Sequence, residues 1–336
     1  ISSTDPTMLI QGKVPGVSIT NTAAGDPNNT ASVQIRGVSS RSAGLGPLIV
    51  IDGVPGGSLT NVNPNDIASF DMLKDGAASE IYGTRGSNGV ILVTTKKGAG
   101  DGTYNISYAG SVAWDSIIDE LDFMSADDYR NIRLGGGDSG IDLGGNYDWF
   151  KGVSRTGFTH KHALTASGGT QRANFRVSAD YRKSNGVDLR SSREEYGGRA
   201  SAEFKSKGGL FNFTANIAPR IIYQNFANWS VFTNAKQANP TTPLMDPENS
   251  QLYYNFQGQV CPWNPVELQK LEKDEGETKL IDMDATAKLN LLPLLWKADK
   301  DCPFTLDTQL TFADHQTGNN KSWFRPSTST IAINSG

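Results

Sequence analysis

The chain has 336 residues, enough for about two domains, and its 31 Lys and Arg residues against 35 Asp and Glu residues give a net charge of −4. Because nucleic-acid-binding proteins present a basic face, this balance, with no basic run longer than Lys96-Lys97, predicts no nucleic-acid partner. No segment has the roughly 18 uninterrupted apolar residues of a membrane helix, whereas the mean hydropathy of −0.40 is compatible with membrane β-strands, in which only alternate residues are apolar.

Residues 1–98 predict a small mixed α+β module. Short apolar runs separated by Gly, Pro, Asn and Asp are typical of short strands with tight turns. The runs are Gly16–Thr20, Val33–Arg36, Leu48–Ile51 and Val90–Thr95. Asp52-Gly53 suits a turn that needs positive φ, and the segment Ala77–Tyr82, ended by Gly83, predicts one or two helical turns. A glycine-rich stretch at residues 96–102 marks the end of the module.

From Thr103 onward the chain alternates apolar and polar residues in segments of about ten, the pattern of two-faced strands. The clearest segment is Ile281–Leu291, in which Ile281 and Leu289 share the apolar face while Asp282 and Lys288 share the polar one. We predict seven strands in all, at Tyr104–Trp114, Phe158–Ser167, Phe175–Tyr181, Tyr196–Phe204, Leu210–Ile217, Ile281–Leu291 and Phe304–Phe312.

The predicted connections alternate between short and long. Short turns are expected at Gly168–Arg172 and Ser206–Gly209, and longer links at about Lys183–Glu195 and Tyr223–Leu280. Such asymmetry is typical of transmembrane β-barrels and is not required of a soluble β-sandwich, which stays open as the alternative. Seven strands do not close a barrel, and an open edge cannot face lipid, so we expect the chain to be the N-terminal part of a longer, trimmed protein.

Several polar residues raise the question of a metal or a catalytic site. The pair His160 and His162 lacks a recurring third ligand, and the acidic residues Asp138, Asp142 and Asp148 lack the spacing of an EF-hand. We predict no metal and no cofactor, and the sequence shows no hydrolase, zinc-protease or phosphate-loop motif, so we predict no enzyme. Asp127 and Asp128 are interpreted as the acidic first turn of a helix capped by Ser125. Cys261 and Cys302 are expected at opposite ends of the strands and therefore unbridged.

The first module resembles the plug of the SusC/RagA family of TonB-dependent outer-membrane transporters. The resemblance rests on residues 9–17, on 33–37, on PLIVIDGVP at 47–55, and above all on NPNDIASFDMLKDGAASEIYGTRGSNGVILVTTKKG at 63–98. It continues more weakly to HALTASGG at 162–169. Gly76 departs from the family, which usually has a helix-compatible residue there. The plug-motif residues are Arg36, Gly37, Asp52, Gly53, Lys74, Asp75, Tyr82, Gly83, Arg85 and Gly86.

This resemblance implies a 22-stranded plugged membrane β-barrel, with residues 1–98 as the plug in its lumen and 99–336 as its first strands and outer loops. It implies nutrient import across the outer membrane of a Gram-negative, Bacteroidetes-like bacterium, driven by a TonB-type protein, with a SusD-like surface lipoprotein as lid. The substrate is an oligosaccharide or a peptide, and these residues do not distinguish them. A siderophore or cobalamin receptor, and a surface-binding or adhesive β protein without transport, remain as alternatives.

If the chain is part of such a transporter, two groups of residues are candidates for functional contacts. Plug charges at Arg36, Lys74, Asp75 and Arg85 are expected to contact wall residues such as Glu203, Asp282 or Asp284. Aromatic residues of the long segment Tyr223–Leu280 are candidates for contact with substrate or lid, or else for an interfacial aromatic belt. They are Trp229, Tyr253, Tyr254 and Trp263.

Overall fold

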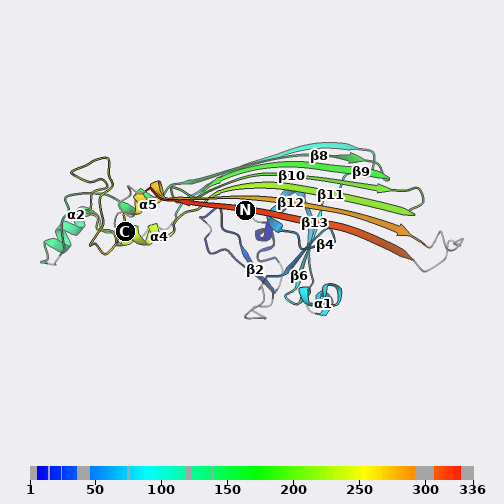
Figure 1. Cartoon of the computed structure of the whole chain (residues 1–336), viewed down its shortest axis with the longest axis horizontal. Coiled ribbons are helices and arrows are strands. Elements are labelled where there is room, and N and C mark those ends of the chain that lie inside the picture. The colour runs from blue at the N-terminus through cyan, green and yellow to red at the C-terminus, as the bar shows by residue number, and fades with distance from the viewer. Residues whose placement is uncertain are drawn as a thin grey trace.

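The computed structural model of the chain describes residues 6–13, 16–23, 25–35, 46–73, 76–118, 123–137, 140–291 and 306–326. In these ranges a small N-terminal module lies against one face of a long curved sheet, here called the wall sheet (Figure 1). We call the face that contacts the module the inner face and the opposite one the outer face. No helix in the described ranges has the length and apolar character needed to cross a membrane.

The N-terminal module contains two small sheets. Strand β1 (Val17–Thr20) pairs antiparallel with β2 (Ser32–Ile35). The second sheet has the order β4-β3-β6-β5, with strands β3 (Leu48–Ile51), β4 (Val54–Pro55), β5 (Ile67–Leu73) and β6 (Val90–Thr95). Short helices join the strands: η1 (Pro6–Ile10), η2 (Leu59–Asn61), η3 (Pro64–Asp66), α1 (Gly76–Tyr82) and η4 (Gly83–Gly86). The strands and the helix predicted for this part are confirmed where the structure describes them.

The four-stranded sheet of the module is covered on both faces, which explains why β3 reads as an unbroken apolar run. On one face, Ile91 and Val93 of β6 pack with Ile35 of β2. On the other, Val50 and Val90 pack against Ala78 of α1.

The wall sheet has seven antiparallel strands among the described residues, each paired with its neighbour in the chain. They are β7 (Tyr104–Asp115), β8 (Gly157–Gly169), β9 (Ala173–Asn185), β10 (Ser192–Lys205), β11 (Phe211–Asn225), β12 (Lys273–Asn290) and β13 (Asp307–Phe324). The seven predicted strands are therefore confirmed. However, β12 begins at Lys273 rather than near Ile281, and β13 ends at Phe324 rather than near Phe312, because the two strands pair along their full length. Apart from Leu280, Ala313 and the terminal Trp323 and Phe324, their extensions are polar on both faces, so the alternation of side chains does not reveal them.

The connections define two ends of the wall sheet. Residues 170–172 and 206–210 form the short turns of one end, the turn end, as predicted. Residues 116–156 and 226–272 form the long connections of the other, the loop end. The long link predicted at Lys183–Glu195 is wrong, because β9 and β10 continue until only residues 186–191 separate them. Asp188 closes this tight connection by accepting hydrogen bonds from the backbone N–H groups of Arg190 and Ser191.

The described residues of the two long connections fold together into a packed body at the loop end, here called the loop lobe (residues 116–118, 123–137, 140–156 and 226–272). Its helical segments are α2 (Ala126–Asp128), the π-helical turn η5 (Tyr129–Leu134), α3 (Trp149–Val153), α4 (Ser230–Gln237) and α5 (Pro265–Leu271). Trp149, Val231, Phe256 and Leu268 form its apolar core with neighbouring residues of both connections. Ser125 caps α2 in a capping box with Asp128, as predicted, and its hydroxyl lowers the pKa of Asp128.

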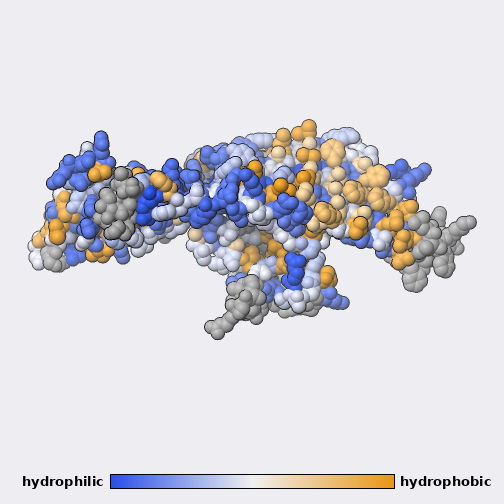
Figure 2. Space-filling view, in the orientation of Figure 1, coloured by the Kyte–Doolittle hydropathy of each residue, from blue (hydrophilic) through white to orange (hydrophobic). Residues whose placement is uncertain are grey.

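The outer face of the wall sheet carries an apolar band between two aromatic rows, and Figure 2 shows apolar residues gathered over the half of the sheet toward the turn end. One row takes a ring from each of the strands β7 to β11, with neighbouring ring centroids 5.0 to 6.5 Å apart. It consists of Tyr108, His162, Tyr181, Tyr196 and Tyr223.

The second row lies near the turn end, where Tyr104 packs against Phe175 and Phe204 stands opposite Phe213. Along β10, the step from Tyr196 to Phe204 is about 26 Å at roughly 3.3 Å per residue. Strands tilted by about 40° reduce this to about 20 Å of height, close to the band of about 25 Å that faces lipid in membrane barrels.

Candidate functional site

The contact between the N-terminal module and the inner face of the wall sheet is built on polar groups. Asp52 and Gly53 form the β3–β4 turn, with φ of +52° and +89°, as predicted for this pair. The Asp52 carboxylate accepts hydrogen bonds from the backbone N–H and hydroxyl of Thr95, at 2.8 and 2.6 Å. It also forms an ion pair with Arg199 of β10, with Nη2 3.0 Å from Oδ2. The turn is thereby attached both to its own sheet and to the wall.

A second attachment is made by Asp66, at the end of η3. Its carboxylate is buried and lies 2.8 Å from Nη2 of Arg176, and it accepts a hydrogen bond of 2.5 Å from the Ser178 hydroxyl. Both partners belong to the polar face of β9. Asp66 was not predicted from the sequence as a contact residue. The Asn63 side chain that caps η3 and positions Asp66 was the available signal.

The wall residues expected to bind plug charges have other partners in the described chain. Glu203 lies 3.7 Å from Nζ of Lys97. Asp282 accepts a hydrogen bond of 2.6 Å from the amide of Asn61, a buried residue of η2. Asp284 accepts one from the neighbouring wall residue Asn216. The inner face is therefore polar where the module contacts it, and Lys97 and Asn61 are described partners of the expected wall residues. Contacts of Arg36, Lys74 and Asp75 with the wall lie outside the described residues.

The remaining plug-motif residues in the described ranges shape the module itself. Tyr82 ends α1 and packs against the core around Val50, and Gly83 adopts φ of +59° where the helix stops. Arg85 is exposed and Gly86 is buried. The motif residues Arg36, Gly37, Lys74 and Asp75 lie outside the described residues, as do Asp138 and Cys302.

The aromatic candidates of the loop lobe separate into different roles. Tyr253 and Tyr254 pack against the apolar core of the lobe. Trp263 is 41% exposed. Trp229 reaches the N-terminal module, where its indole N–H donates to Asp26 at 3.1 Å. Burial raises the pKa of Asp26, opposed by hydrogen bonds from Trp229 and the Asn28 backbone.

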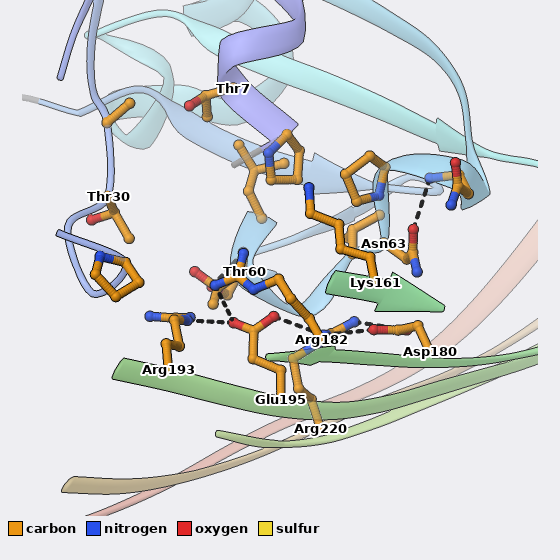
Figure 3. A pocket seen from close by; sticks show the side chains of 18 of the residues that line it. Thr7, Thr30, Thr60, Asn63, Lys161, Asp180, Arg182, Arg193, Glu195 and Arg220 are labelled. Carbon is orange, nitrogen blue, oxygen red and sulfur yellow. Dashed lines mark hydrogen bonds and ion pairs between the residues drawn. The ribbon is translucent and has the colours of Figure 1, made fainter. Parts of the chain in front are cut away.

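A cluster of charged side chains lies on the inner face close to the loop end (Figure 3). It was not predicted from the sequence. Glu195 is surrounded by guanidinium groups: Arg193 Nε is 2.5 Å and Arg182 Nη2 is 3.3 Å from its Oε1, and Arg220 Nη1 is 3.5 Å from its Oε2. Arg220 also binds Asp180 through two hydrogen bonds, at 2.9 and 3.0 Å. These residues come from β9, β10 and β11, so only strand pairing brings them together.

Other residues considered for a metal serve different contacts. His160 and His162 lie on the outer face, 3.3 Å apart at their nearest ring nitrogens, and His162 contacts the Tyr108 hydroxyl. Asp142 binds Arg130, which lowers the pKa of that carboxyl, and Asp148 caps α3. In the ranges that the structure describes, no three His, Cys, Asp or Glu side chains are grouped so that they can hold a metal ion.

Comparison with known proteins bears on both parts of the chain. Residues 2–90 match the family model of the TonB-dependent Receptor Plug Domain. TonB-dependent receptor SusC of Bacteroides thetaiotaomicron is 39% identical over 191 residues, which are 53% of this chain and 19% of the relative. TonB-dependent receptor P26 of Formosa agariphila is 29% identical over 284 residues, 79% of this chain and 28% of the relative. The chain thus spans less than a third of the length of these relatives.

A solved structure extends the likeness to the fold. The structure of the RagAB peptide importer in the closed-closed state matches with a TM-score of 0.76 and 21% identity, covering 96% of this chain and 40% of that one. The expected fold class, a plug followed by part of a barrel wall, is confirmed. The N-terminal module, the wall sheet and these matches together show that the chain belongs to the TonB-dependent receptors of the SusC/RagA type.

Proposed function

We propose that the full-length protein imports an oligosaccharide or a peptide across the outer membrane, and that a TonB-type energising protein drives this import by moving the plug. We infer that residues 1–98 form the plug and residues 99–336 a part of the barrel wall. The turn end then faces the periplasm and the loop end faces the outside, because short turns are periplasmic in such barrels. The apolar band between the aromatic rows is the surface in contact with outer-membrane lipid.

The observation that carries the proposal is the nature of the contact between plug and wall. Asp52 with Arg199, Asp66 with Arg176, and Asn61 with Asp282 are separate polar contacts. An apolar interface of similar extent would have to expose its surface to water on opening, at about 25 cal/mol per Å². Polar groups exchange their partners for water at a smaller net cost, about 0.5 to 1.5 kcal/mol for a typical hydrogen bond. Such an interface suits a plug that is displaced and returns.

We further infer that a SusD-like lipoprotein covers the loop end. The loop lobe supports this assignment, since it is a packed body with its own core rather than a set of separate loops. It also contacts the plug through Trp229 and Asp26. A lipoprotein bound to this lobe is therefore connected to the plug through the contact of Trp229 with Asp26.

Uptake by the whole organism tests the proposal. Radiolabelled oligosaccharide and peptide pools are offered to the wild type and to a strain lacking the gene, with and without a protonophore that removes the energy source of TonB. We expect uptake of one pool that needs both the gene and the proton gradient, and a lipoprotein that co-purifies with the receptor in mild detergent. Uptake that is unchanged by either treatment for both pools contradicts the proposal and favours a binding or adhesive role.

A further inference from the structure

The charged cluster around Glu195 forms one side of a cavity of about 880 Å³ between the N-terminal module and the wall sheet. The cavity lies toward the loop end, because Arg193 is the second residue of β10 from that end. Neutral polar residues of the module form the opposite side. They include Asn29, Thr30, Ser32, Gln34 and Thr60. Under the proposed function this is the outer half of the lumen, which an incoming solute reaches before it meets the rest of the plug.

Positive charge exceeds negative charge on the cavity wall. Among the described residues that line it, the cationic side chains are Lys161, Arg182, Arg193 and Arg220, and the anionic ones are Asp180 and Glu195. Outside the lining, Asp26 adds negative charge near Arg193, although burial raises the pKa of Asp26, and Asp115 adds negative charge near Lys161. The side chains that line the cavity keep an excess of positive charge.

The arginines also keep donor groups that the protein does not use. Arg182 and Arg220 are 7% and 5% exposed, and within the described part of the chain their Nε–H groups have no hydrogen-bond partner. A buried donor without a partner costs about 1 to 3 kcal/mol, and more when the group is charged. These two Nε–H groups are themselves buried, so an anion in the cavity would balance the positive charge of the two guanidinium groups rather than bind the Nε–H groups.

The surroundings of Gly197 show that the side chains on this side of the cavity are closely packed. A Cβ atom at this position would lie 2.5 Å from Nη2 of Arg220 and 2.7 Å from Oδ1 of Asp180. Only glycine leaves the space in which Asp180 binds both Nη atoms of Arg220. Arg220 is thereby held in one orientation, since a bidentate pair fixes the plane of the guanidinium.

We propose that this cavity binds a carboxylate group of the transported substrate. Arg182, whose fork is not held by a bidentate partner in the described structure, matches a carboxylate in shape and charge, and the neutral hydroxyl and amide groups opposite suit the remainder of a hydrophilic oligomer. The inference rests on the proposed function and narrows it to acidic substrates. Two sources supply the same group: a uronic acid in an oligosaccharide, and the C-terminus or an acidic side chain in a peptide.

Calorimetric titration of the full-length receptor in detergent, with any lipoprotein that co-purifies, tests this proposal. The probes are trigalacturonate with its methyl ester, and tetra-alanine with its C-terminal amide. We expect one of the two acids to bind at least about tenfold more tightly than its neutral counterpart, the factor that one charged hydrogen bond supplies. The pair that shows the preference identifies the source of the carboxylate. If neither acid is preferred, the proposal is overturned.

Two sets of variants test whether the preference for the acid arises in the cavity. Arg182→Gln is expected to abolish the preference for the acid, whereas Lys183→Gln, the same charge change on the outer face of the same strand, is expected to retain it. If Arg182→Gln does not assemble, Thr30→Asp tests the site instead. Thr30 lines the cavity and is exposed, so this substitution adds a negative charge there without disturbing a buried contact. Thr30→Asp should weaken binding of the acid severalfold and leave binding of the neutral probe unchanged. The uncharged control Thr30→Asn should leave the binding of both probes unchanged.

Failure of this inference differs from failure of the proposed function. Energised uptake of a neutral substrate, with an acid preference that is absent or survives in Arg182→Gln, overturns the carboxylate site and leaves the importer intact. Loss of all energy-dependent uptake overturns the importer, and binding of the acid is still measured directly by calorimetry.

Discussion

Replacing Asp66 by alanine weakens the attachment of the plug to the wall by an amount that the structure allows us to work out. The carboxylate is 2% exposed and binds both Arg176 Nη2, at 2.8 Å, and the Ser178 hydroxyl, at 2.5 Å. Its removal leaves the Arg176 guanidinium without its charge partner, and breaking one side of a buried ion pair costs about 3 to 5 kcal/mol. Because the Arg176 side chain retains 14% exposure, we expect a cost of about 3 kcal/mol.

Native-state hydrogen exchange on the full-length receptor measures this cost locally, as the opening free energy of amides in β5 and β6. A double-mutant cycle of Asp66→Ala, Arg176→Met and both together isolates the pair. We expect a coupling free energy of about 2 kcal/mol, with the double variant more stable than Asp66→Ala alone, since it leaves no orphaned charge.

The pair Lys97 and Glu203 provides the control for this cycle. Its atoms are 3.7 Å apart and the Lys97 side chain is 56% exposed, so solvent screens it and the coupling is expected to stay below about 1 kcal/mol. Effects at Asp66 and Arg176 that add to within about 0.5 kcal/mol, or a control coupling as large as theirs, would refute the reasoning.

Further predictions concern the lipid face, the loop lobe and pH. Met283→Arg, near the middle of the apolar band, should cost about 2 to 4 kcal/mol in an equilibrium folding assay in lipid, against about 0 to 1 for Leu289→Arg near the turn end; equal costs would argue against the band. Burial raises the pKa of the Cys261 thiol, which is 1% exposed, so maleimide should label it at least about 100-fold more slowly in the native protein than after unfolding. Labelling at equal rates would contradict the packing of the lobe. Arg130 lowers the pKa of Asp142, so their contact stabilises the lobe fully above the usual carboxyl pKa of about 3.9 and loses this effect as pH falls through the lowered pKa. Asp142→Asn should therefore lower the thermal stability of the lobe at about pH 6, by an amount that shrinks steadily as pH falls below about 3.9; an effect that is independent of pH would show that charge is not the cause.

The strands of both parts are visible in the sequence because each is a local pattern. Alternation of side chains with a period of two is set by the pleat of a strand and does not depend on its partners. The turn at Asp52-Gly53 is equally local, since it follows from the positive φ that these residues tolerate. The same locality explains the errors. The polar extensions of β12 and β13 carry no alternation, and the β9–β10 connection was predicted too long because the adjoining ends of β9 and β10 are polar as well.

The sequence by itself determined which residues form strands, which of their faces is polar, and which family they resemble. Only the tertiary structure decided which polar groups meet. Asp66 with Arg176, Trp229 with Asp26, and the ring of arginines around Glu195 each join residues that are far apart in the chain or on neighbouring strands. The register between strands sets these contacts, and a shift of one residue turns every side chain to the opposite face. Register depends on the paired strands together, so no single segment of the sequence contains it.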